Sequence, residues 1–499
     1  MASTIFSTIL GKSLRFSENL LLARSYCSAR RFINRRNLYS RISPLGDPSI
    51  SLIPVLDRWV EEGNAVKATE LQHIVKDLRG SKRFKQALEV SEWMSSKKLC
   101  PFSPGDQAVQ LELIGRVRGL DFAESYFQNL IDEDKTDKRY GAMLNCYVRE
   151  GLIDKSLSYM QKIKDMGFAS ALNYNNIMCL YTHTDQFEKV PGVLSQMKED
   201  GISPDIFSYR ICISSYGARS DLENMEKVLE EMEKQSHVST DWMTYSMVAS
   251  YYIKAGLKEK ALIHLKKCED KVDKNALGYN HLISHYASLG NKKAMMRLWN
   301  LQKAKCKKQL NRDYITILGC LLKLEELEEM EKLIEEWESS ANYYDFRVTN
   351  ILLIGYTRKG LMETAEKVLR SIVKKGKTPT PNSWVIIAYG YLEKQNMAQA
   401  FLCLKEALAV RAENKGWKPK SDGFSTVLSW AADNRDLDEV VDFADSLKTV
   451  IPLNRDMYLS LIKMYVRRGK EVDGLLENMK DDKIEVDEEI EKILGSRQE

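Results

Sequence analysis

Aromatic side chains recur along most of the chain at a spacing of about 35 residues. Successive anchors of this pattern are 34 to 36 residues apart, except for one step of 40. A second position follows each anchor by seven residues, and it is tyrosine in eight of ten cases. Seven residues make two helical turns, so both positions lie on one face of one helix. The anchors are Tyr140, Tyr174, Tyr209, Tyr245, Tyr279, Tyr314, Thr349, Trp384, Phe424 and Tyr458.

Each repeat also carries the signals of two helices. Glycines such as Gly151 and Gly256 stand eleven residues after their anchors, where a first helix should end. An amphipathic stretch follows, for example 222–234, and several repeats close with a turn like that of Gly201–Pro204. Alternating β-branched segments are absent from the sequence. The pattern therefore predicts an all-α protein, a right-handed α-solenoid of about 10 to 12 stacked helix-turn-helix repeats.

This period divides the chain into segments. We expect a lead over 1–43, an N-terminal cap over 44–67, two degenerate repeats over 68–136, ten repeats over 137–487 and a tail over 488–499. The ten repeats are 137–170, 171–205, 206–241, 242–275, 276–310, 311–345, 346–380, 381–420, 421–454 and 455–487.

The lead differs from the rest of the chain in charge. Residues 1–43 hold eight Lys and Arg side chains and one acid, whereas the remainder holds 66 basic and 69 acidic side chains. A segment rich in Arg and Ser, poor in acids and with apolar residues at helical spacing is typical of an organellar transit peptide. We expect import into the mitochondrial matrix, with the chloroplast as the alternative. A disordered basic tail without a role in import is the other interpretation. Since the body is slightly acidic, contacts with nucleic acid must depend on local basic patches.

Catalytic and metal-binding patterns are weak. The nine cysteines include no C-x-x-C pair, which favours a reducing compartment over a disulfide or zinc framework. His281 and His285 have a spacing that can bind zinc, but no third ligand is evident. The sequence has no phosphate loop, dinucleotide fingerprint or nucleophile elbow, and no run of about 18 apolar residues. We expect a protein that is not an enzyme and that has no cofactor, metal, small-molecule substrate or membrane span.

The repeats resemble pentatricopeptide repeats. Residues 173–177, Asn-Tyr-Asn-Asn-Ile, and 278–283, Gly-Tyr-Asn-His-Leu-Ile, are similar to the family's V-T-Y-N-x-L-I opening, and 201–205 is similar to its G-I-x-P-D ending. Tetratricopeptide repeats hold to 34 residues and lack that ending. The resemblance covers about 68–487 and is strongest over 137–380. It points to the pure-repeat class found chiefly in plant organelles, which binds single-stranded RNA with one base per repeat.

The resemblance also implies which residues read the bases. In the family, one reader follows the tyrosine anchor and a second reader ends the repeat. Only three of the ten pairs fit the family code cleanly: Asn175/Asp205 would prefer uracil, and two others would prefer adenine. The implied base-reading residues are Asn175, Asp205, Ser246, Asn275, Asn280, Asn350, Thr380, Ser425 and Asn454.

Further contacts with RNA follow from the same resemblance. Apolar residues near the start of each repeat would stack on bases, although partial burial in the core is an equal alternative; they are Leu172, Phe207, Met243 and Leu277. Basic residues late in the first helix would contact phosphates, unless they form only a solvated helix face. They are Arg149, Lys254, Lys323, Arg358 and Arg467.

Two functions remain open from the sequence. In the first, the solenoid binds one stretch of organellar single-stranded RNA and influences transcript processing, stability or translation. In the second, the repeats are a protein-interaction scaffold, for example on the mitochondrial ribosome. A basic patch at 292–312 followed by an acidic block at 325–338 either docks a protein, repels RNA or forms ordinary outer surface of second helices.

Overall fold

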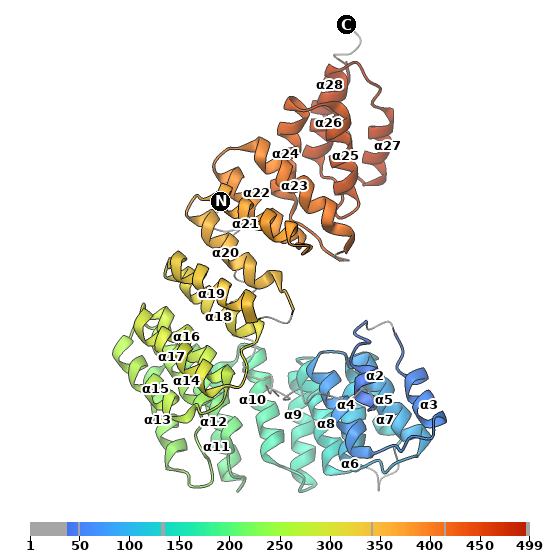
Figure 1. Ribbon diagram of the computed structural model, residues 1–499. Coiled ribbons are helices and arrows are strands. Elements are labelled where there is room, and N and C mark those ends of the chain that lie inside the picture. Colours follow the sequence, from blue (N-terminus) through green and yellow to red (C-terminus); the bar gives the residue numbers. More distant parts are fainter. Residues whose placement is uncertain (1–36, 48–49, 131–134, 341–342, 414–415, 496–499) are drawn as a thin grey trace. The chain divides into compact units, whose positions relative to one another are not determined.

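The described residues fold entirely into helices and turns. The structure, a computed structural model, describes residues 37–47, 50–130, 135–340, 343–413 and 416–495. No strand occurs in these ranges, and consecutive helices pair into hairpins that stack one after another (Figure 1). The prediction of an all-α solenoid is therefore confirmed. Most of the expected transit peptide, residues 1–36, lies outside the described residues.

The chain divides into two compact units, and the first ends at residue 268. Its early helices cover the expected cap and the two degenerate repeats, and α2 lies within the segment expected to be a lead, with Leu38 and Ile42 buried. Its helices are α2 (Leu38–Ile42), α3 (Ile53–Glu61), α4 (Ala68–Gly80), α5 (Phe84–Lys97), α6 (Pro104–Val117), α7 (Leu120–Gln128), α8 (Asp137–Arg149), α9 (Ile153–Asp165), α10 (Ala171–His183), the 3-10 turn η4 (Phe187–Lys189), α11 (Val190–Glu199), α12 (Ile206–Ala218), α13 (Leu222–Lys234), α14 (Trp242–Lys254) and α15 (Lys258–Lys271), which runs three residues past the boundary.

The second unit begins at residue 269. Its last helix, α28, lies within the segment expected to be a tail and packs on α26, with Ile490 buried. Its helices are α16 (Ala276–Ser288), α17 (Lys292–Lys305), α18 (Asn311–Lys323), α19 (Leu327–Ser340), α20 (Phe346–Arg358), α21 (Met362–Lys374), α22 (Pro381–Glu393), α23 (Met397–Ala409), the 3-10 turn η5 (Val410–Glu413), α24 (Ser421–Asn434), α25 (Leu437–Lys448), α26 (Arg455–Arg467), α27 (Asp473–Asp481) and α28 (Glu488–Gly495).

The turn inside most hairpins contains a residue with left-handed backbone geometry, although the turn between α24 and α25 does not. Gly360 follows α20 with φ +74°, a conformation that glycine adopts without steric cost. The equivalent positions after α18 and α22 hold Glu325 and Gln395, with φ +60° and +58°. A side chain in this conformation costs about 1–2 kcal/mol. The hairpin geometry is therefore imposed by packing even where the local sequence resists it.

Within each unit, the first helix of one hairpin packs on the first helix of the next. At α12 and α14 this packing is so close that a Cβ atom added to Gly217 would lie 2.4 Å from the ring of Tyr251. The hydroxyls of Tyr251 and Ser214 bond across the same contact at 2.8 Å. The first helices thus form one continuous layer within each unit, which we call the first-helix row.

The aromatic anchors form the core between the two helix layers. All ten are buried, and Tyr174, Tyr209, Tyr279 and Tyr458 are only 1% exposed. The hydroxyls of Tyr209, Tyr245 and Tyr314 donate to carboxylates on second helices, as in the 2.8 Å bond from Tyr209 to Glu231. A buried aromatic ring with a hydrogen-bonded rim contributes both packing area and a defined orientation. The repeat spacing seen in the sequence is therefore the spacing of the large buried side chains in the core.

Candidate nucleic-acid interface

The residues expected to read bases occupy two fixed places on the first-helix row. The first reader is the fifth residue of a first helix, as Asn175 is in α10. The second reader is the N-cap of the next first helix, as Asp205 is for α12. A residue one turn into a helix and the N-cap of the neighbouring helix can meet when the two helices pack side by side. Both places therefore adjoin at each junction between repeats within a unit.

At the junction of α10 and α12 the two expected readers contact each other. Asn175 Nδ2 donates to Asp205 Oδ1 at 3.1 Å, and the hydroxyl of Ser208 donates to Asn175 Oδ1 at 2.7 Å. Asp205 Oδ1 also accepts the backbone N–H of Ser208 at 2.8 Å, which caps α12. The second oxygen of Asp205 takes part in none of the hydrogen bonds that the structure describes. The pair thus presents one uncommitted carboxylate oxygen beside an amide.

At the next junction, between α12 and α14, the two reader positions form an ion pair with each other. Arg210, the fifth residue of α12, pairs with Asp241, the N-cap of α14. Its Nε also donates to the hydroxyl of Thr244 at 2.9 Å. The Arg210 side chain is 12% exposed, and its guanidinium is bonded to two residues. This junction has the same geometry as the one before it, but its polar groups satisfy one another.

Asn280 belongs to a buried network in the second unit. Its Nδ2 donates to Asp313 Oδ1 at 2.6 Å, and its Oδ1 accepts from Gln302 Nε2 at 3.2 Å. Asn280 is 5% exposed, and the side chains of Asp313 and Gln302 are fully buried. Its amide therefore links α16, α17 and α18 at this point.

Asn350 has a different environment. Its Oδ1 is buried and accepts no hydrogen bond from the part of the chain that the structure describes. The nearest equivalent of Ser208 is Ser383, whose hydroxyl instead bonds to that of Thr380 at 3.0 Å. Thr380 is the N-cap of α22. This junction therefore holds an amide oxygen in need of a donor.

The remaining expected readers lie at the same two places. Ser246, the fifth residue of α14, is 3% exposed. Asn275 and Asn454 cap α16 and α26 through their side-chain oxygens. Ser425, in α24, lines a groove of about 340 Å³ between α24 and α26 together with Leu459 and Arg467. The groove brings an expected base reader and an expected phosphate contact to one site.

The expected stacking residues are the second residues of their helices, and their exposure differs. Leu172 is 64% exposed and Phe207 is 38% exposed. Met243 and Leu277 are half-buried. Exposed apolar side chains at this position flank Asn175 on α10 and α12. Leu172, one helical turn before Asn175, therefore adds an exposed apolar side chain on the same side of α10.

The five expected phosphate contacts also differ in their surroundings. Arg149 pairs with Glu150 at 3.0 Å, and Arg467 pairs with Asp433. Lys254 is exposed with its Nζ 5.7 Å from the centre of the Tyr251 ring. Lys323 and Arg358 are exposed at the ends of α18 and α20. The Arg467 side chain is 58% exposed, and a surface pair of this kind is weak enough to give way to a phosphate. Arg149 is only 21% exposed and has a buried Nη1, so it is less accessible.

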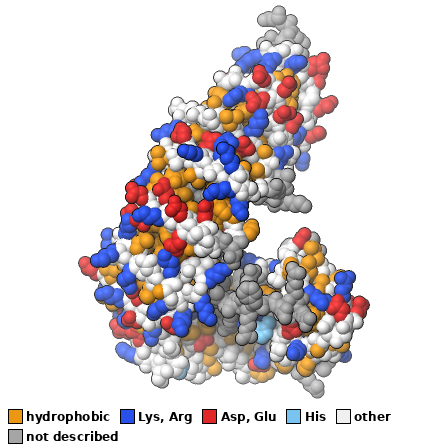
Figure 2. All heavy atoms as spheres, viewed as in Figure 1, with side chains coloured by type: hydrophobic (Ala, Val, Ile, Leu, Met, Phe, Trp, Pro, Cys, Tyr) orange, Lys and Arg blue, Asp and Glu red, His pale blue; other side chains and the backbone are white. Residues whose placement is uncertain are grey.

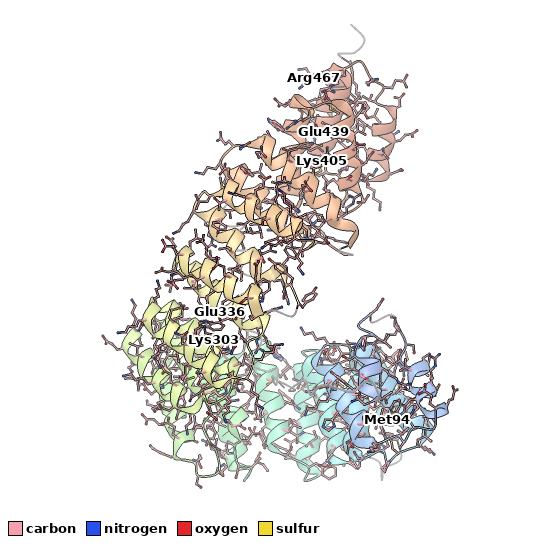
Figure 3. All side chains as sticks on the ribbon, viewed as in Figure 1. Met94, Lys303, Glu336, Lys405, Glu439 and Arg467 are labelled. Atoms are coloured by element: carbon pink, nitrogen blue, oxygen red, sulfur yellow. The ribbon has the colours of Figure 1, made fainter. Side chains whose placement is uncertain are left out.

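The exposed sides of the second helices form an outer face, and Figure 2 shows positive and negative side chains interspersed over the visible surface. Lysines there pair with acids one repeat later: Lys198 with Glu231 at 2.6 Å in the first unit, and Lys303 with Glu336 at 2.9 Å in the second. Figure 3 shows Lys303 beside Glu336, and Lys405 beside Glu439 at 3.1 Å. These pairs favour the interpretation of the basic patch and the acidic block as ordinary outer surface. We call them the outer ion pairs.

Sequence reasoning missed the residues that hold the expected readers. Ser208 and Gln302 orient Asn175 and Asn280, and neither stood out from composition or motif. The outer ion pairs were also missed, although a signal existed. Lys303 and Glu336 are 33 residues apart, close to the repeat period, so a comparison of charges at that offset would have found them.

Cysteine chemistry finds no support at this interface. Cys146 and Cys212 are fully buried in first helices. Burial raises the pKa of Cys146 to about 11 and that of Cys212 to about 12, so both thiols stay protonated at neutral pH. In the described ranges, no group of three or more His, Cys, Asp or Glu side chains is placed to hold a metal, and no helix has the length and apolar character of a membrane span.

Comparisons with known proteins give the family of the chain. A model of the PPR repeat family matches residues 169–217, and a PPR repeat model matches 140–168, 207–237 and 348–376. A mitochondrial pentatricopeptide repeat-containing protein of Arabidopsis thaliana is 47% identical over 486 residues, which cover 97% of this chain and 98% of that protein. The chain belongs to the pentatricopeptide repeat family. The resemblance seen in the sequence is confirmed.

Two further pentatricopeptide repeat proteins share less identity with this chain. A second mitochondrial member from Arabidopsis thaliana is 37% identical, covering 80% of this chain and 82% of that protein. The crystal structure of the pentatricopeptide repeat protein PPR10 from maize is 18% identical, with a TM-score of 0.43, and covers 97% of this chain and 80% of that chain. The two Arabidopsis relatives are named as mitochondrial proteins, and the predicted location of this chain, the mitochondrion, is confirmed.

Proposed function

We propose that the chain binds single-stranded mitochondrial RNA along the first-helix row of each unit, without catalysis. By doing so it influences the processing, stability or translation of a transcript. The observation that carries this proposal is the junction of α10 and α12, where Asn175 and Asp205 offer polar groups beside the exposed Leu172 and Phe207. Unstacked bases have a flat apolar face and a polar edge, and this junction complements both.

The chemistry of that junction favours uracil. The uncommitted carboxylate oxygen of Asp205 accepts a hydrogen bond, and the second N–H of the Asn175 amide donates one. Uracil presents an N–H donor between two carbonyl acceptors on its Watson–Crick edge. A uracil placed here therefore donates its N–H to Asp205 and accepts the Asn175 N–H at a carbonyl. The closed pair of Arg210 and Asp241 offers neither, so we expect the next repeat to contribute little base discrimination.

Binding of synthetic RNA tests this assignment. The double variant Asn175→Ala, Ser246→Ala should weaken binding to the cognate RNA by about tenfold and binding to a scrambled RNA much less, since one or two base contacts are worth about 1–3 kcal/mol. Asn176→Ala is the matched control for position 175, because Asn176 is the adjacent amide on α10 and is similarly buried. An equal loss on both RNAs would contradict base reading at these repeats.

The cognate RNA is obtained by ultraviolet crosslinking of a tagged chain in isolated mitochondria, followed by sequencing of the attached RNA. We expect one narrow footprint on a messenger RNA or an intron. Reads confined to ribosomal RNA, or no enrichment over an untagged control, would contradict the proposal and favour a scaffold on the ribosome.

A further inference from the structure

One edge of the second unit carries lysines that the outer ion pairs do not use. Loops that join a second helix to the next first helix all lie on the same edge, because successive helices in the stack are antiparallel. Three of these loops, following α17, α21 and η5, are rich in lysine. The lysines are Lys305, Lys307, Lys308, Lys374, Lys375, Lys377, Lys418 and Lys420, and we call them the lysine edge.

Most of these lysines have no carboxylate partner. Lys375 lies 3.9 Å from Glu338, and the Nζ of Lys377 lies 5.9 Å from the centre of the Tyr344 ring. The other six are exposed and form no ion pair with any residue in the described ranges. The nearby Asp345 is neutralised by Arg347 at 2.7 Å. The exposed Asp422, two residues after Lys420, and Glu338 offset part of this charge, and the edge keeps a net positive charge, in contrast to the outer face.

Two further features of the edge suit a nucleic acid. Tyr343 is 77% exposed at the loop that precedes α20, and the half-buried Trp417 donates to Asn382 at 3.0 Å. The first helices α18, α20, α22 and α24 also begin here, so their positive dipole ends add to the charge of the lysines. Neighbouring first helices pack about 8–10 Å apart, so the three loops span roughly 30 Å.

We propose that the lysine edge binds the phosphate backbone of RNA, independently of sequence, beside the base-reading row. The inference rests on the proposed function and adds a second contact that the reader residues do not make. An RNA backbone suits the edge better than an acidic protein, because lysine is depleted at protein interfaces and the charges are spread along a line. Exposed Tyr343 gives a base a surface to stack on.

The test compares two variants with equal loss of charge. The edge variant is Lys307→Gln, Lys374→Gln, Lys418→Gln, with one change in each loop. The control variant is Lys293→Gln, Lys367→Gln, Lys394→Gln, which removes three lysines of the second unit that lie away from the edge and form no ion pair within the described part of the chain. Both full-length variants are titrated with a poly(U) oligonucleotide and with a mixed-sequence oligonucleotide over a range of salt concentrations.

We expect the edge variant to bind both oligonucleotides more weakly by the same factor. The slope of log affinity against log salt should fall by about 2, because each phosphate contact on a single strand contributes about 0.7. The control variant should keep the slope of the unchanged chain. Identical slopes for the edge and control variants would overturn the proposal for the lysine edge.

A failure of the proposed function can be told apart from a failure of the lysine-edge proposal. If the unchanged chain binds neither oligonucleotide nor the crosslinked RNA, RNA binding itself is contradicted. If the edge variant keeps its RNA affinity but loses a protein that copurifies with the unchanged chain and the control, the edge is a docking site for an acidic protein instead, and the proposal is overturned.

Discussion

At the level of single residues, the Asn175 side chain both carries the amide proposed to read a base and joins two neighbouring repeats. Its amide bonds to the N-cap of the next first helix and to Ser208 in the following turn. A side chain held from two sides loses little conformational freedom when a ligand arrives, which favours affinity and discrimination. The same bonds mean that any change at position 175 also acts on the packing of α10 against α12.

His264 provides a prediction on pH. It is 4% exposed, stacks on Tyr252 with ring centres 5.4 Å apart and lies 3.7 Å from Glu226. Burial and the charge of Lys267 lower the pKa of His264 more than nearby carboxylates raise it. The unfolded chain therefore takes up a proton near pH 6.5 and the folded chain only at a lower pH. The stability that the neutral ring gives is complete above about pH 6.5 and is lost as the pH falls toward the folded pKa.

We expect the urea midpoint of the first unit to fall between pH 7.5 and pH 5.5, and to fall less in a His264→Gln variant, since the histidine pKa of about 6.5 lies in this range. The midpoint is followed by circular dichroism at each pH. His183→Gln, at an exposed histidine, is the control and should follow the unchanged chain. Equal pH dependence in the His264→Gln variant would contradict this role of burial.

At the level of elements, the sequence predicts the positions of the helices but not the contacts at each junction between repeats. Positions of the helices follow from the spacing of anchors such as Tyr174 and Tyr209, because a large buried ring fixes which face of a helix points inward. The sequence therefore predicted the all-α stack. It did not show how junctions differ, because Asn175 and Asn280 stand at the same place and are both buried, but only Asn280 bonds to a second helix, through Gln302. Such differences depend on side chains that are remote in sequence.

The hairpin turns give a prediction on stability. Gln395→Gly should stabilise the second unit by about 0.5–1 kcal/mol, because it removes the strain of a left-handed side chain at the cost of some backbone entropy. The reciprocal change, Gly360→Gln, should destabilise it by a similar amount, since Gly360 has the same geometry. Urea denaturation of both variants checks this. If Gln395→Gly does not raise the free energy of unfolding, or if Gly360→Gln does not lower it, other contacts relieve the strain in these turns.

At the level of the whole molecule, contacts are made mostly between neighbouring hairpins. Stability in such a chain is close to a sum of repeat terms and nearest-neighbour terms, so damage at one repeat spreads only a short distance. The outer ion pairs and the first-helix row follow the same rule, since each links one repeat to the next.

Gly217→Ala tests this local character. The added methyl group collides with the ring of Tyr251 and should cost about 1–3 kcal/mol. Hydrogen exchange followed by mass spectrometry should show faster exchange in α12 to α14, with little change in α20 to α26. Gly192→Ala is the control, because a Cβ atom there meets nothing within 4 Å. A uniform increase over the chain would mean that it unfolds as one cooperative body.

The cap shared by Asn175, Asp205 and Ser208 has a consequence for redirecting the protein to another RNA. The residues that would select a base also hold the start of the next helix, so base preference cannot be changed at one residue without disturbing the packing of the helices. A change in base preference therefore also needs a compatible side chain at the position of Ser208 in the following helix. Successful retargeting therefore depends on choosing residues in sets of three, drawn from two adjacent repeats.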